Sequence, residues 1–152
     1  MIKYFITDCD GVLTDGKYYY SSEGKQLVTF HANDSVAFNE LKNLGVEITM
    51  ISSGNYQNIN KKRANDLGVN FAYAPFGKKM DVVLSLGVDL EYMCYVGDCY
   101  DDIDLLEQSK ISFTPNNALH EIKSKAKIVT NRCGGEGCIL EIVFTLKNLG
   151  LL

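Results

Sequence analysis

The sequence has no apolar run that approaches the roughly 20 residues needed to cross a bilayer. Its first ten residues, MIKYFITDCD, also lack an apolar stretch long enough for a secretory signal. Lys and Arg total 15 against 19 Asp and Glu, so the formal charge is -4 and no basic excess indicates a nucleic-acid surface. We therefore expect a soluble, cytoplasmic protein that binds neither membranes nor nucleic acid.

The five cysteines form no CxxC pair and are odd in number. Two of them, Cys133 and Cys138, bracket CGGEGC, a spacing that matches no common zinc site. The cysteines are therefore interpreted as free thiols in a reducing compartment.

The sequence shows no internal repeat, low-complexity segment or linker, which favours a single domain over residues 1–152. Strand-like apolar runs alternate with segments that carry apolar residues at helical spacing. The strand-like runs are 2–7, 46–51, 70–74, 92–96, 110–114 and 127–130, and the helix-like segments are 34–44, 55–67, 79–86, 117–126 and 138–149. This alternation predicts an α/β fold: a Rossmann-like three-layer sandwich with a mostly parallel central sheet.

One segment breaks the alternation. Residues 16–31, GKYYYSSEGKQLVTFH, read as two strands around the turn SSEG. They follow the first strand directly, so we expect a small hairpin that leans over the carboxyl end of that strand.

The residues that follow three of the predicted strands are polar and chemically related. They are Asp8 and Asp10 after the first, Ser53 and Gly54 after the second, and Asp98 and Asp102 after the fourth, with Lys78 and Lys79 opening the preceding helix. Because the carboxyl ends of parallel strands share one edge of the sheet, we expect these side chains to converge there.

The same residue types suit a phosphate monoester. An acidic site repels such a dianion unless a cation intervenes, and Mg²⁺ bound by one or two carboxylates reverses the sign. A lysine adds positive charge, while hydroxyls and backbone N–H groups bond the other phosphate oxygens. One carboxylate can then attack phosphorus, and a second, two residues on and on the same side of the strand, can transfer protons.

The order DxDGxxTD, strand-end hydroxyl, lysine and GDxxxD resembles the haloacid dehalogenase superfamily of phosphatases over nearly the whole chain. That resemblance implies hydrolysis of a phosphomonoester through an aspartyl-phosphate, with Asp8 as the nucleophile and Asp10 as the general acid/base. It also implies a Mg²⁺ ion held by Asp8, the backbone carbonyl of Asp10 and Asp98, with Asp102 supporting these ligands from behind.

The resemblance assigns the remaining roles in the same way. Ser53, which precedes Gly54, takes the place of the phosphate-binding hydroxyl. Lys79 takes the place of the motif lysine because Met80 supplies the apolar residue that follows it, and Lys78 is the alternative.

A narrower resemblance is to the small sugar-acid phosphatases of that superfamily, which have no large cap domain. It is carried by DGVLTDG, FHANDS and RCGGEGC. It implies a 2-keto-3-deoxy sugar-acid phosphate as substrate, of the 3-deoxy-octulosonate 8-phosphate type, and a product used for surface glycans such as lipopolysaccharide. It further implies a homotetramer assembled through the hairpins, for which Tyr18, Tyr19 and Tyr20 are suitable interface residues.

The sequence departs from that pattern at three positions. The family commonly has TGR where this chain has SGN, so Asn55 replaces an arginine suited to a carboxylate. Cys99 stands at the second aspartate of GDD, and Asp34 is followed by Ser35 in place of glycine. Asn55, Asp34 and Arg63 are the candidate substrate-binding residues beside Ser53 and Gly54.

Several alternatives remain open at this point. The substrate of such a phosphatase can be a nonulosonate or sialate 9-phosphate, as in sialic acid biosynthesis. The missing arginine favours a broad phosphatase of small metabolites. A different class of function is a non-catalytic assembly module for a sugar-acid cytidylyltransferase.

Overall fold

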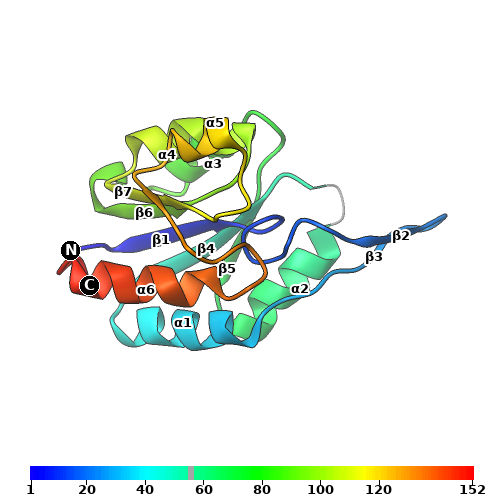
Figure 1. The fold of residues 1–152 in the computed structure, drawn as a ribbon, viewed down its shortest axis with the longest axis horizontal. Helices are drawn as coiled ribbons and strands as arrows, with labels where there is room; N and C mark the ends of the chain where they lie inside the picture. The colour runs from blue at the N-terminus through cyan, green and yellow to red at the C-terminus, as the bar shows by residue number, and fades with distance from the viewer. Residues whose placement is uncertain (55–56) are drawn as a thin grey trace.

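Six parallel strands form the centre of the protein, as the sequence predicts (Figure 1). The computed structural model describes residues 1–54 and 57–152. The sheet has the order β5-β4-β1-β6-β7-β8, and every neighbouring pair is parallel. The strands are β1 (Tyr4–Asp8), β4 (Glu47–Ser52), β5 (Asn70–Tyr73), β6 (Met93–Val96), β7 (Ile111–Thr114) and β8 (Ile128–Val129). Each coincides with one of the predicted apolar runs.

Helices cover both faces of this sheet and complete a three-layer sandwich (Figure 1). The helices are α1 (Ala32–Asn43), α2 (Gln57–Leu67), α3 (Lys79–Ser85), α4 (Ile103–Gln108), α5 (His120–Lys123) and α6 (Cys138–Asn148). In Figure 1, α1, α2 and α6 lie below the sheet, and α3, α4 and α5 lie above it. The predicted α/β fold is confirmed.

The two faces of the sheet hold two separate hydrophobic clusters. One contains Phe5 with Phe38 of α1 and Ile142 of α6, and the other contains Tyr95 with Leu105 of α4. The central strands are buried on both faces, which is why they read in the sequence as continuous apolar runs. The sheet edge is thereby a rigid platform for the residues that follow its strands.

The hairpin is also present, formed by β2 (Tyr19–Ser21) and β3 (Gly24–Leu27). It projects away from the sandwich as a two-stranded antiparallel ribbon (Figure 1). Within the described ranges, no helix is both long and apolar enough to cross a membrane.

Three helix predictions differ from the structure. Helix α4 lies between two predicted strands, where no helix was predicted. Helix α5 is one short turn, whereas the pattern predicted 117–126. Helix α1 begins two residues earlier than predicted, because the Nδ1 atom of His31 accepts a hydrogen bond from the backbone N–H of Asn33 and caps the helix.

Candidate active site

The predicted polar residues meet at the carboxyl edge of three adjacent strands. Asp8 is the last residue of β1, Ser52 is the last residue of β4, and Asp98 follows β6 by two residues. Lys79, the first residue of α3, reaches the same edge. Residues from these elements line a cavity of about 290 Å³, namely Asp8, Asp10, Ser53, Gly54, Lys79 and Cys99 among others.

A buried ion-pair network lies at the base of this cavity. The Nζ atom of Lys79 is 3.1 Å from an Asp8 oxygen and 2.6 Å from an Asp102 oxygen, and the Lys79 side chain is 1% exposed. The Tyr95 hydroxyl donates to the same Asp102 oxygen at 2.6 Å. The other Asp102 oxygen accepts the backbone N–H groups of Asp98 and Cys99 at 2.9 and 3.0 Å. Asp102 is therefore saturated with donors, and it fixes Lys79 and the loop after β6.

The charges in this network are strongly perturbed. Burial acts to lower the pKa of Lys79, but the carboxylates of Asp8 and Asp102 raise it above its usual value, so the ammonium form persists. Burial acts to raise the pKa of Asp102, yet Lys79 and the donors around it hold it below its usual value. For Asp8, burial raises the pKa by more than the Lys79 charge lowers it, and the neighbouring carboxylates raise it further.

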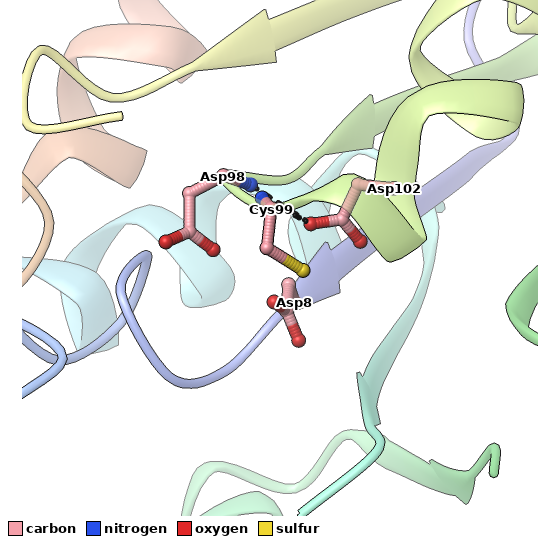
Figure 2. Close-up of side chains that lie close together, drawn as sticks. All are labelled: Asp8, Asp98, Cys99 and Asp102. Atoms are coloured by element: carbon pink, nitrogen blue, oxygen red, sulfur yellow. Dashed lines mark hydrogen bonds between the residues drawn. The ribbon is translucent and has the colours of Figure 1, made fainter. Parts of the chain in front are cut away.

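Asp98 completes the acidic cluster (Figure 2). Burial and the Asp102 charge raise the pKa of Asp98 to about 6. Its Oδ1 atom is buried without a hydrogen-bond partner in the described part of the chain. Its Oδ2 atom lies so close to Gly11 (φ +91°) that a Cβ there would approach it to 2.0 Å, so this packing requires glycine.

The cluster fits a divalent cation. Ligand atoms of Asp8, Asp98, Cys99 and Asp102 all lie within 4.8 Å of one another. The Asp98 oxygen lacks a donor, and the ionised forms of Asp8 and Asp98 are disfavoured by their surroundings. A bound cation would pair with that oxygen and stabilise both ionised carboxylates. Because Asp102 is already saturated, the carboxylates of Asp8 and Asp98 are the ones that remain to hold an ion.

Asp10 is held by two residues that were not among the predicted site residues. Lys25 of β3 lies 2.6 Å from one Asp10 oxygen, and the Lys25 side chain is only 7% exposed. The Asn60 amide of α2 donates to the other oxygen at 3.2 Å and also to the Ser52 hydroxyl. The turn SSEG predicts that Lys25 lies on a hairpin, but no local signal shows which carboxylate it meets.

The loop after β4 faces the same cavity. Ser53 and Gly54 line it, and the Ser53 hydroxyl donates to Asp101 at 2.6 Å. The Ser52 hydroxyl is turned to the backbone N–H of Gly54 at 3.3 Å. Asn55, a predicted substrate-binding residue, lies outside the described residues.

Asp34 and Arg63 lie together but are not among the residues that line the cavity. Asp34 is 2% exposed. Burial raises its pKa to about 7 against the opposing effects of Arg63 and the backbone N–H of Ile139. Arg63 lies over the Phe30 ring and donates to the Ser35 hydroxyl at 3.4 Å. The substrate roles of Asp34 and Arg63 stay predictions.

The two lysine candidates are in contrasting places. Lys79 is buried in the network, whereas Lys78 is exposed and pairs with Asp81 at 3.1 Å. The structure thus brings Lys79, and not Lys78, to the acidic cluster.

The glycine loop before α6 packs directly on the loop that carries the aspartates. A Cβ on Gly134 would lie 1.9 Å from the Gly11 carbonyl oxygen, so the two backbones are in contact. Asn117 joins them, since its Nδ2 donates to Gly11 at 3.1 Å and its Oδ1 accepts from Gly134 at 2.6 Å. Asn117 is a positioning residue that lies far from both partners in sequence, which is why the sequence did not reveal it.

Comparison with known proteins agrees with this geometry. A family model described as haloacid dehalogenase-like hydrolase matches residues 80–139. The 3-deoxy-D-manno-octulosonate 8-phosphate phosphatase KdsC of Haemophilus influenzae is 30% identical over 145 residues, which cover 93% of this chain and 80% of that protein.

Solved structures of similar proteins share the fold. The cobalt-bound deoxy-D-mannose-octulosonate 8-phosphate phosphatase from Haemophilus influenzae has a TM-score of 0.88 at 29% identity, covering 98% of this chain and 90% of the other. The 3-deoxy-D-manno-octulosonate 8-phosphate phosphatase from Moraxella catarrhalis, in complex with magnesium, phosphate and KDO, has a TM-score of 0.86 at 26% identity. That match covers 96% of this chain and 86% of the other.

Proposed function

The chain belongs to the haloacid dehalogenase-like phosphatases that include the 3-deoxy-D-manno-octulosonate 8-phosphate phosphatases, and we propose that it hydrolyses the phosphomonoester of such a sugar acid. The observation that carries the proposal is the meeting of Asp8, Asp98, Asp102 and Lys79 at one sheet edge. The matches to relatives named for this activity cover most of this chain. The product fits the supply of sugar acid for lipopolysaccharide.

Mg²⁺ is the proposed metal, supported by the magnesium complex of the Moraxella relative and by the acidic cluster. We propose that the carboxylates of Asp8 and Asp98 and the backbone carbonyl of Asp10 hold it. When bound, it neutralises the charge between these carboxylates and the phosphate dianion and polarises the phosphoryl oxygens.

Asp8 and Asp10 have different roles in the proposed reaction: Asp8 is the nucleophile, and Asp10 transfers protons. A carboxylate oxygen of Asp8 attacks phosphorus, the bond from phosphorus to the ester oxygen breaks, and the departing oxygen takes a proton from Asp10. Asp10 then takes a proton from a water molecule whose oxygen attacks the phosphorus of the aspartyl-phosphate. Inorganic phosphate leaves, and the Asp8 carboxylate is restored.

The remaining residues bind phosphate in this proposal. The Lys79 ammonium, held by Asp102 next to Asp8, supplies the positive charge. The Ser53 hydroxyl and the backbone at Gly54 face the same cavity and are the proposed hydrogen-bonding groups for the phosphate oxygens.

The test is phosphate release with Mg²⁺ from a panel of phosphomonoesters. The panel contains 3-deoxy-octulosonate 8-phosphate, nonulosonate and sialate 9-phosphates, hexose phosphates and a nucleotide, each also run with Asp8→Asn. We expect selective turnover of the octulosonate ester that chelator and Asp8→Asn both abolish. Selective turnover of a 9-phosphate would show that the substrate is a nine-carbon sugar acid, while the proposed mechanism would stand.

A broad phosphatase is the second candidate, favoured by the neutral Asn55 in place of the family's arginine. It predicts similar turnover across the panel. No turnover by a folded, metal-binding protein would instead favour the assembly module.

We also propose that the hairpins assemble the chain into a homotetramer in which a neighbour covers each site. Tyr18 and Tyr19 on the hairpin are 54% and 71% exposed, and Phe76 at the cavity is 75% exposed. Such large exposed apolar side chains are suitable interface residues. Sedimentation of the wild type and of Tyr19→Ser is the test: a tetramer that weakens in the variant supports the assembly, and a wild-type monomer contradicts it.

The proposed location is the cytoplasm, supported by the five cysteines, which are all free as expected in a reducing compartment.

A further inference from the structure

The thiol of Cys99 lies inside the acidic cluster. Its sulfur points toward Asp8, between Asp98 and Asp102 (Figure 2). It is one of four groups whose ligand atoms lie within 4.8 Å of one another, and it lines the cavity in which the proposed phosphate binds. The backbone N–H of Cys99 donates to Asp102 at 3.0 Å, which fixes the position of the residue.

The hydrogen bonds of the cluster show which of these groups are available to a cation. Both oxygens of Asp102 are occupied by donors from Lys79, Tyr95 and the backbone. Asp8 uses its Oδ1 atom for Lys79 and for the backbone N–H of Cys9. The Oδ1 atom of Asp98 has no hydrogen-bond partner among the described residues. Asp98 belongs to the same group of possible ligands as Asp8 and Cys99.

We propose that Cys99 is a sulfur ligand of the metal site and that it raises the affinity of this site for Zn²⁺ and similar thiophilic divalent cations, while Mg²⁺ binds through the oxygen ligands alone. The inference rests on the proposed function for the location of the site. Two carboxylates and one sulfur are a mixed donor set that suits a borderline-soft ion such as Zn²⁺. Mg²⁺ strongly prefers oxygen ligands in octahedral geometry and gains nothing from sulfur.

A redox role for the same thiol is disfavoured. Burial and the Asp102 charge raise the pKa of Cys99, and a protonated thiol reacts slowly with oxidants. A cation that binds the sulfur displaces the thiol proton to solvent, as metal sites with thiolate ligands do.

Cobalt(II) is the probe for this proposal, because a cobalt–thiolate bond gives a near-ultraviolet charge-transfer band that carboxylates do not give. Metal-free wild-type protein, Cys99→Ser and Cys99→Asp are titrated with Co²⁺. Cys133→Ser is the matched control, since it removes a partly exposed thiol outside the cluster. Affinities for Zn²⁺ and Mg²⁺ are measured in parallel by competition with a chelating dye.

The expected result is a charge-transfer band in the wild type and in Cys133→Ser that disappears in Cys99→Ser, although Co²⁺ still binds. Affinity for Zn²⁺ should fall at least about tenfold in Cys99→Ser, as when a metal site loses a supporting group, while affinity for Mg²⁺ changes little. Cys99→Asp should bind Mg²⁺ more tightly than the wild type.

Three results would overturn the inference: Co²⁺ bound by the wild type without the band, a band that survives in Cys99→Ser, or no binding of any divalent cation. Phosphate release by the same samples separates the two proposals. Turnover with Mg²⁺ but no charge-transfer band would contradict the sulfur ligand and support the phosphatase. A band without turnover of any ester would support the sulfur ligand and contradict the phosphatase.

Discussion

The acidic pocket and the hairpin are neighbours, but they are built in opposite ways. In the pocket, Lys79 and Asp102 are at most 1% exposed, and each makes several polar contacts. In the hairpin, Tyr19 and Leu27 are 71% and 64% exposed. Lys25 joins the two regions through its ion pair with Asp10. The comparison shows that the ion-pair network is built within one chain, whereas the hairpin keeps large apolar side chains exposed.

Lys79→Met should have the largest effect, because it removes the cation between two buried carboxylates. We expect phosphate release to fall about 10²–10³-fold. The free energy of unfolding should fall by about 3–5 kcal/mol, since Asp8 and Asp102 lose their partner. Lys78→Met is the control, because its exposed pair with Asp81 should change stability by less than about 0.5 kcal/mol. Equal effects of the two substitutions, measured by phosphate release and urea unfolding, would contradict the buried network.

Gly134→Ala tests whether the glycine loop holds the loop of the aspartates in place. The added methyl group would lie 1.9 Å from the Gly11 carbonyl oxygen, so the two backbones must separate. We expect a loss of about 1–3 kcal/mol in the free energy of unfolding and a fall of up to about 10²-fold in kcat from misplaced groups. Gly45→Ala, which meets nothing within 4 Å but has a φ of +76°, controls for backbone strain alone. An unchanged kcat in Gly134→Ala would show that the contact does not position the site.

Lys25→Met removes the ion pair with Asp10 that joins the hairpin to the acidic pocket. Asp10 loses the ammonium that lies 2.6 Å away, so we expect kcat to fall about tenfold, a part of what general acid–base catalysis contributes. Stability should change by less than about 1 kcal/mol, because Asp10 is partly exposed. Lys17→Met removes an exposed lysine before the hairpin and serves as the control. Full activity in Lys25→Met would show that the ion pair from the hairpin to Asp10 does not contribute to catalysis.

Asp34→Asn tests a contribution to stability that depends on pH. The pKa of Asp34 is about 7 in the folded protein and about 3.8 when unfolded, so between these values the native state binds more protons. The wild type therefore loses stability as pH rises from about 4 to 7, at up to about 1.4 kcal/mol per pH unit from this group. Asp34→Asn lacks that contribution, so the stability of the wild type relative to the variant should decline over this range.

Urea unfolding of both proteins across the pH series measures the difference. Asp66→Asn, on the exposed side of α2, is the control because it removes a carboxyl group that is not buried. A constant difference between the wild type and Asp34→Asn would show that the Asp34 carboxyl group is ionised throughout.

The sequence predicted the pocket better than it predicted the contacts around it. Asp8 ends one buried strand and Asp98 lies two residues beyond another, so the rule for parallel sheets places them without any long-range information. Lys25, Asn60 and Asn117 reach the same site from elements whose position depends on tertiary packing. Helix α4 was missed because it is only six residues long, too short for a clear helical period.

Trapping of the aspartyl-phosphate tests the central claim most directly. The wild type and Asp10→Asn are mixed with the sugar-acid phosphate and Mg²⁺, quenched in acid within the first turnover, and digested for mass spectrometry. Within the first turnover we expect a phosphoryl group on the wild-type peptide that contains Asp8, and slower formation of it in Asp10→Asn, because the departing oxygen takes its proton from Asp10. Turnover with an unmodified Asp8 peptide, or a phosphoryl group on another residue, would contradict it.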